Sequence, residues 1–317
     1  MTRHSLIRLA VTLASVAVLA FAARDLDVSS VADAVRRIDP VFGLLAALAM
    51  LGAKVGAKVV RSQILLVASC RRLGIAPPPL ATTARLLVAS HAAGQLAWGP
   101  LGFTVRTIAL CDGGMPLIAV ARVHVAERIA EAAGIAALAL AAFAFAPAAI
   151  WDAWLGRILL AALAAAALAG IAVAASPRLR AFVTRNADTG GALARSSAWA
   201  LASSLADVAV LLLAARGMHV AVDVPTAILA FLAVNGACAV PVTPAQLGVQ
   251  ESAIVVAFAT AGIPAPQALA CALAYRAAHV VPLALVGLPA LFATWTRRSR
   301  PAPPAAPATP ATPAAGG

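Results

Sequence analysis

The sequence predicts an all-α polytopic membrane protein, with six full spans and two re-entrant hairpins arranged as an inverted-topology repeat. Three observations predict it. Of the 317 residues, 62% are hydrophobic and only 11% are charged, and the mean hydropathy is +0.94, which leaves too little polar surface to cover a water-soluble globule. The apolar residues gather in segments long enough to cross a bilayer. One spacing of Gly, Pro and Arg occurs twice, in two segments of similar organisation.

Six apolar segments reach the length of about 17 residues that a spanning helix requires. These predicted spans are residues 5–23, 40–61, 117–146, 157–175, 198–215 and 265–293. Arg3, Arg8 and the apolar run that follows them resemble a signal peptide, so cleavage of this segment stays open. We expect it to remain as an uncleaved span because further spans follow it.

Two further apolar segments, residues 80–112 and 225–262, contain Gly/Pro breaks and predict re-entrant hairpins. Eight full crossings would leave the second half of each segment too short, so we expect each to enter and leave by one face. The first hairpin would open to the cytoplasm and the second to the outside. The predicted break residues are Pro100 and Gly102 in the first hairpin, and Pro244 and Gly248 in the second.

The distribution of charge predicts the orientation and the location. Arg-rich stretches at 71–85, 178–195 and 297–300 contain few acids, whereas residues 24–39 are acid-rich. Because basic loops stay in the cytoplasm, we expect a multi-pass protein of a bacterial-type inner (plasma) membrane with both termini cytoplasmic. Residues 1–295 would form one transmembrane domain with pseudo-repeats at about 40–146 and 198–293. Residues 296–317, rich in Pro and Ala, predict a disordered cytoplasmic tail.

Several function classes are disfavoured by what the sequence lacks. The net charge of +12 contains no long basic run, so we expect no nucleic-acid partner. The four cysteines form no C-x-x-C or Cys/His cluster, so no metal site is expected. No nucleotide-binding G-x-x-x-x-G-K-[ST] motif or catalytic Ser/His/Asp order is present, so we expect no cofactor and no enzymatic activity.

The repeated spacing is G-x-P followed by eleven residues and an arginine, and it gives Gly114, Pro116 and Arg128, then Gly262, Pro264 and Arg276. Twelve helical positions correspond to about 18 Å, near the middle of a hydrocarbon layer of about 30 Å. A central arginine is disfavoured by about 3 kcal/mol, so both should be functional or paired with a carboxylate. A chance match is the alternative, but the interrupted segment before each copy favours a repeat.

Further polar residues predict a midplane cavity. Arg128 and Glu131 share one face of a helix with Glu127 beside them, and Glu251 begins a half-helix in the second hairpin. We expect Arg128 and Arg276 to bind a phosphate-bearing headgroup while Glu127 and Glu251 orient them. Pairs of Glu and Arg that only hold helices together are the plainer alternative.

Three more positions complete the candidate set. Lys54 lies about 10 Å deeper than Arg61 on one helix face and could line the cytoplasmic mouth, whereas Lys58 and Arg61 fit snorkelling to headgroups. Arg106 of the first hairpin could meet Glu251 of the second at the centre. Asp207 is interpreted as a helix-bridging acceptor or a partner for a cation. His91, His219 and His279 are interpreted as packing or interface residues.

Motifs in both halves resemble those of one known family, the lysylphosphatidylglycerol synthase transmembrane, or flippase-like, family. Its P-x-G-L-G-x-x-E … G-x-P … Y-R … P pattern is matched by Pro244–Glu251, Gly262–Pro264, Tyr275-Arg276 and Pro282. Its P-x-x-G-E-x-x-R and E-R elements are similar to Pro100–Arg106 and Glu127-Arg128. Two departures stand out: Gln246 replaces a usual Gly, and Phe103 stands where an acidic residue is common.

The resemblance implies a membrane domain that moves lipids or lipid-linked molecules between leaflets, with Tyr275 beside the second arginine as part of its site. Some relatives are fused to an aminoacyl-lipid synthase, and we expect no such soluble domain here. The predicted function is therefore flipping of a lipid or lipid-linked anionic substrate. A small-solute permease and a non-transporting accessory subunit stay open as alternatives, as do association with a lipid-modifying enzyme and assembly as a homo-oligomer.

Overall fold

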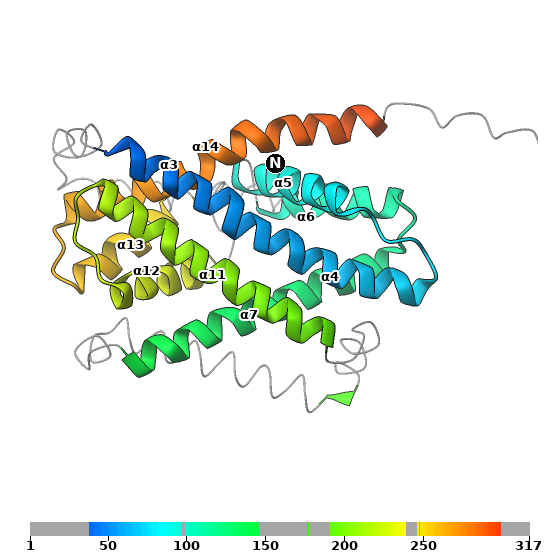
Figure 1. Cartoon of the computed structure of the whole chain (residues 1–317), viewed down its shortest axis with the longest axis horizontal. Coiled ribbons are helices and arrows are strands. Elements are labelled where there is room, and N and C mark those ends of the chain that lie inside the picture. Colours follow the sequence, from blue (N-terminus) through cyan, green and yellow to red (C-terminus); the bar gives the residue numbers. More distant parts are fainter. Residues whose placement is uncertain are drawn as a thin grey trace, which may run out of the picture.

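The computed structural model describes residues 38–96, 99–145, 176–177, 191–238, 246 and 248–298, and every regular element in this part of the chain is a helix (Figure 1). In chain order the elements are α3 (Pro40–Leu48), the π-type helix η1 (Ala49–Val55), α4 (Gly56–Leu73), α5 (Leu80–Leu96), α6 (Gly99–Asp112), α7 (Leu117–Phe145), α11 (Gly191–Gly217), α12 (Val224–Ala237), α13 (Val249–Ala259) and α14 (Ala265–Arg298). The predicted all-helical class is confirmed.

Three of the described helical stretches are long and apolar enough to cross a membrane: Pro40–Leu73, Gly191–Gly217 and Ala265–Thr294. The predicted span 117–146 is the helix α7, which ends at Phe145. The predicted spans 5–23 and 157–175 lie outside the described residues. The chain is thus a helical membrane protein, and six as the number of full spans stays a prediction.

Three of the described helices are longer than the sequence predicted, and one of them is α11, which covers Gly191–Gly217 where the predicted span was 198–215. The span expected at 40–61 continues through α4 to Leu73, and it ends where Gly74 takes the left-handed conformation at φ 67°. Arginines are good helix formers, so the basic end of this helix stays helical. Helix α14 likewise continues to Arg298, three residues into the predicted tail; residues 299–317 lie outside the described part.

A π-type segment interrupts the first long helix where it passes the centre of the bundle. Helices α3 and α4 are joined without a loop by η1, and Lys54 lies in the last turn of η1. The backbone carbonyl of Lys54 accepts a hydrogen bond from the Ser203 hydroxyl of α11 at 3.3 Å. Single π turns within α-helices are frequent at functional sites.

The segment predicted as the first hairpin folds into the packed pair α5 and α6, but its break differs from the prediction. Helix α6 begins at Gly99, so Pro100 and Gly102 both lie inside its first turn. Gly102 is therefore not a break residue. It serves close packing instead, because a Cβ at this position would overlap the carbonyl oxygen of Ser90 in α5.

The segment predicted as the second hairpin forms α12 and α13, and here the predicted Gly248 does mark the start of a helix. Gly248 has φ 81°, which favours glycine, and its N–H donates to the Glu251 carboxylate at 2.9 Å. Pro244 lies outside the described residues. At the other end of the pair, Asp223 caps α12 by accepting from the Thr226 N–H at 2.9 Å.

Both G-x-P copies fold into the same turn. Gly114 and Gly262 have φ of 91° and 73°, and in each turn the N–H after the glycine donates to the carbonyl five positions earlier, at 3.1 Å. This is the hydrogen bond of a Schellman motif, which ends one helix before the next begins. Helices α7 and α14 start directly after the prolines, and they run in opposite directions in Figure 1.

Small residues let neighbouring helices approach closely. A Cβ on Gly134 of α7 would lie 2.8 Å from the Leu201 nitrogen of α11, and a Cβ on Gly287 of α14 would lie 2.5 Å from the Ala92 Cβ of α5. Membrane helices associate through such small-residue contacts because the lipid offers no hydrophobic driving force. The close contacts fix the positions of the helices that carry the charged side chains.

Candidate functional site

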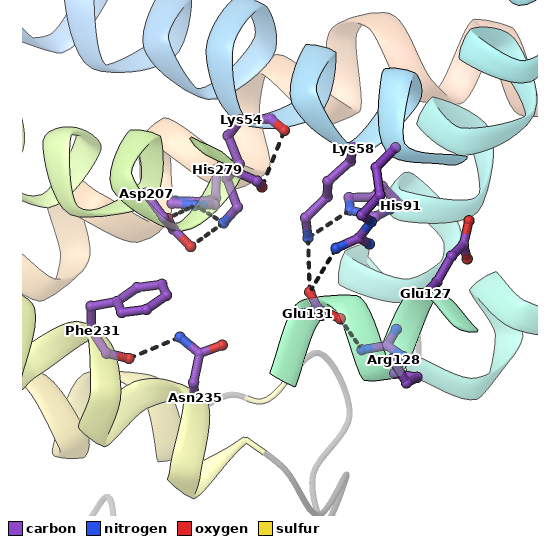
Figure 2. A network of polar contacts seen from close by, with 12 residues as sticks. Lys54, Lys58, His91, Glu127, Arg128, Glu131, Asp207, Phe231, Asn235 and His279 are labelled. Carbon is purple, nitrogen blue, oxygen red and sulfur yellow. Dashed lines mark hydrogen bonds and ion pairs between the residues drawn. The ribbon is translucent and has the colours of Figure 1, made fainter. Parts of the chain in front are cut away.

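A cavity of about 630 Å³ lies between the helices and is lined by residues from η1, α4 to α7 and α11 to α14. Its polar character is unusual for the interior of an apolar bundle. The charged side chains that line it are Lys54, Lys58, Arg61, Arg106, Arg128, Glu127, Glu131 and Asp207. Among the described residues, five cationic groups thus face three carboxylates. Figure 2 shows Asp207 and Lys54 on one side of the space, and Lys58, Glu131 and Arg128 on the other.

The first group is centred on Asp207 of α11. Its carboxylate is 2.6 Å from the Lys54 ammonium, and it accepts a hydrogen bond from the Tyr275 hydroxyl at 2.7 Å. His279 Nε2 lies 2.9 Å from the same carboxylate and 2.7 Å from the Lys54 ammonium. Since each of the four side chains contacts another member, we call Lys54, Asp207, Tyr275 and His279 the Asp207 cluster. It joins three helices that are distant in sequence.

The hydrogen bonds of His279 indicate its tautomer. Nδ1 lies 2.9 Å from the backbone carbonyl of Tyr275, and a carbonyl only accepts, so Nδ1 carries a proton. Nε2 lies between the Lys54 ammonium and the Asp207 carboxylate. It accepts from Lys54 when the ring is neutral and donates to Asp207 when the ring is protonated.

The second group joins α4, α6 and α7 through Glu127. Arg106 donates to both Glu127 oxygens, at 2.7 and 2.8 Å, and the Ser62 hydroxyl donates to Glu127 at 2.6 Å and also contacts Arg106. All three residues are buried. The prediction that Glu127 orients Arg128 is wrong. Neighbouring helical residues point about 100° apart, so Glu127 reaches Arg106 of α6 while Arg128 contacts Glu131 and the Phe103 ring.

The third group surrounds Glu131, one turn after Glu127. Arg128 contacts this carboxylate at 2.7 Å, whereas Lys58 and Arg61 are 3.7 and 4.0 Å away. Lys58 also lies 3.3 Å from His91. The snorkelling interpretation of Lys58 and Arg61 is wrong, because both line the cavity and Arg61 is only 5% exposed. They follow Lys54 on one face of the same helix, which turns all three cations inward.

The two arginines of the repeated spacing have different environments. Arg276 forms the predicted ion pair with Glu251, and neither is among the described residues that line the cavity. The side chain of Arg128 is 61% exposed, and its guanidinium lies over the Phe103 ring, 4.7 Å from the centroid. Phe103 and Glu251 each precede the proline of their own copy by 13 positions. Phe103 therefore occupies in the first copy the place that the carboxylate takes in the second.

The expected meeting of Arg106 and Glu251 is wrong. Each pairs with the long helix that follows its own short-helix pair: Arg106 with α7 and Glu251 with α14. The sequence also did not foresee the roles of Ser62, His91 and His279. For His279 a signal was available, because it lies one helical turn after Tyr275 and so shares its face.

Comparison with known proteins agrees with the motif resemblance. A family model described as the lysylphosphatidylglycerol synthase TM region matches residues 5–287. The chain belongs to this family. No curated protein matches it. Membership confirms a membrane protein from a family associated with lipid modification or flipping. For this member of the family, the polar cavity is the candidate site.

Proposed function

We propose that the protein moves a lipid, or a lipid-linked molecule, with an anionic headgroup between the two leaflets of the membrane. The observation that carries the proposal is the cavity, where five cationic side chains of the described part of the chain face three carboxylates inside an otherwise apolar bundle. Burial of charge in a membrane is costly, and a cavity with excess positive charge suits an anion. A volume of about 630 Å³ is within the range of small-molecule sites.

The arrangement of the helices supports an inverted-topology repeat. In Figure 1, α5 and α6 lie in the right half of the bundle, α12 and α13 lie in the left half, and α7 and α14 run in opposite directions. We propose that each short-helix pair enters the membrane from its own side and returns. Such paired interrupted segments around a central site are typical of transporters.

The basic helix ends support the proposed orientation. The C-terminal ends of α4 and α14 and the N-terminal end of α11 lie on the same side in Figure 1. These ends carry Arg71 and Arg72 in α4, Arg195 in α11 and Arg298 in α14. We place this side in the cytoplasm and the protein in a bacterial-type inner membrane, with both termini cytoplasmic.

In the proposed mechanism the headgroup crosses through the cavity while the acyl chains stay in the bilayer. Arg128 is the cation best placed to contact the headgroup first, since its side chain is exposed. The contacts described above hold it only to Glu131 and to the Phe103 ring. A guanidinium binds phosphate oxygens in a bidentate manner and can exchange a carboxylate for them. The protein acts here as a transporter and not as an enzyme.

Reconstitution tests the proposal. The purified protein is placed in liposomes with trace headgroup-labelled lipids, one with an anionic phosphate headgroup and one neutral lipid without phosphate per experiment, with and without a pH gradient. Loss of label accessibility in one leaflet is measured over time. We expect movement of a phosphate-bearing lipid and a strong reduction in Arg128→Gln, with Arg195→Gln as the control for loss of a surface charge.

Failure of the wild-type protein to move any lipid would refute the proposal. Uptake of a soluble anion into the same liposomes would then favour the small-solute permease. Absence of both activities, together with co-purification of a lipid-modifying enzyme, would favour the accessory subunit.

A further inference from the structure

The cations of the cavity are neutralised to different extents. Arg106 has two hydrogen bonds to Glu127, and Lys54 contacts both Asp207 and His279. These two cations have short contacts to carboxylates of their own. The remaining three, Lys58, Arg61 and Arg128, share the single carboxylate of Glu131. The excess positive charge of the cavity is therefore concentrated at one place.

Arg61 shows most clearly that the group around Glu131 lacks hydrogen-bond acceptors. Its side chain is 6% exposed, yet Nε and Nη1 have no hydrogen-bond partner among the described residues. Buried donors of a charged group are rarely left unsatisfied, because the cost is about 1–3 kcal/mol or more. Glu131 lies 4.0 Å from Nη1, which is within reach of electrostatic attraction but too far for a hydrogen bond.

The distances around Glu131 leave room for another acceptor. Lys58 is 3.7 Å from the carboxylate and Arg128 is 2.7 Å from it, so one carboxylate serves three donors unequally. A carboxylate has two oxygens, whereas a phosphate group presents three or four around a tetrahedral centre. Such a group could accept from an ammonium and two guanidinium groups at once. Figure 2 shows Lys58, Glu131 and Arg128 converging from α4 and α7 on the same space.

We infer that Lys58, Arg61 and Arg128 form a binding seat for a phosphate group, in which Glu131 is the resident counter-ion that the phosphate displaces. The inference deepens the proposed function and rests on it for the source of the phosphate, a lipid headgroup. The seat itself would also accept free inorganic phosphate. The Asp207 cluster and the Arg106–Glu127 pair lie outside the seat, because their charges are already matched.

Isothermal titration calorimetry on the purified full-length protein in mild detergent tests the seat. The probes are short-chain phosphatidic acid, the matching diacylglycerol without phosphate, and inorganic phosphate. We expect phosphatidic acid to bind and diacylglycerol not to bind. Arg61→Gln and Lys58→Gln should weaken the binding of phosphatidic acid by about tenfold or more, as loss of a hydrogen bond to a charged group predicts. Arg71→Gln, a change at an exposed arginine of the same helix, should leave it unchanged.

A variant that is expected to bind more tightly guards against misfolding as the explanation. Glu131→Gln removes the competing carboxylate and should tighten the binding of phosphatidic acid, which a damaged protein would not do. Wild-type affinity in Arg61→Gln, or weaker binding in Glu131→Gln, would overturn the seat. Equal binding of inorganic phosphate and phosphatidic acid supports the seat and identifies the phosphate alone as the recognised group.

The two proposals can fail separately. If wild-type protein binds phosphatidic acid through Arg61 but moves no lipid in liposomes, the transport function fails and the seat stands. If lipid is moved at the wild-type rate by Arg61→Gln with unchanged affinity, the transport function stands and the seat is overturned.

Discussion

Removing one member of the buried Lys54–Asp207 pair should destabilise the protein strongly, and removing both should cost little more than removing one. The two charged atoms are 2.6 Å apart, and the side chains are 12% and 10% exposed. At an effective dielectric constant of about 20, this separation gives a gross attraction of about 6 kcal/mol. Much of it offsets desolvation, but a single substitution leaves the other charge buried and unpaired, at a cost of about 3–5 kcal/mol.

The variants are Lys54→Met, Asp207→Asn and the double substitution. Asparagine keeps an oxygen that can accept from Tyr275, so the change at Asp207 mainly removes charge. Unfolding of purified protein in mild detergent is followed by circular dichroism during titration with sodium dodecyl sulfate. We expect each single variant to lose about 3–5 kcal/mol of the free energy of unfolding, and the double variant to show a coupling energy of about 2 kcal/mol or more.

Arg128→Met is the matched control, because its side chain is 61% exposed although it also contacts a carboxylate. Exposed ion pairs contribute about 1 kcal/mol or less, so this variant should unfold close to the wild-type midpoint. If the two single variants at Lys54 and Asp207 prove additive within about 0.5 kcal/mol, the pair is not coupled and the reasoning fails.

Three further predictions follow from the packing and the repeat. Phe103→Glu should give Arg128 the carboxylate that the first copy of the repeat lacks, and should therefore weaken the binding of phosphatidic acid measured by calorimetry. An unchanged affinity would contradict this prediction. Gly134→Ala should lower the free energy of unfolding in detergent by about 1–3 kcal/mol because its Cβ meets backbone, whereas Gly236→Ala, with open space around it, should not. Gly248→Ala should lower the free energy of unfolding by about 1 kcal/mol because the residue has a positive φ. An unfolding midpoint equal to that of the wild type would contradict this.

The helices and their ends could be predicted because they depend on local sequence. Apolar length predicted six spans, and the four that fall on described residues are all long helices. Glycines set the ends of α4 and α6, at Gly74 and Gly114. The packing role of Gly102 could not be predicted from local sequence. A glycine before a helix and a glycine packed against a neighbouring helix look alike in one sequence, and only the contact with Ser90 distinguishes them.

The charged residues of the site were foreseen better than their partners. Spacing predicted that Glu127 and Arg276 would be paired, and both are. The partner of Glu127 was wrong, because the choice between Arg106 and Arg128 depends on how α6 packs against α7. Lys54 and Asp207 are separated by 153 positions. No local pattern links residues so far apart, so the Asp207 cluster became evident only with the tertiary structure.

The shared Schellman turns have a consequence for how sequence changes in this region are tolerated. Because α7 and α14 both start from a fixed turn, the number of residues between the turn and each charge determines the direction in which that charge points. Inserting one residue after Pro116 would rotate everything beyond it by about 100° and advance it by about 1.5 Å. Glu127 would then leave Arg106, and Glu131 would leave Lys58. Apolar substitutions along the first turns of α7 should therefore be far better tolerated than single-residue insertions or deletions.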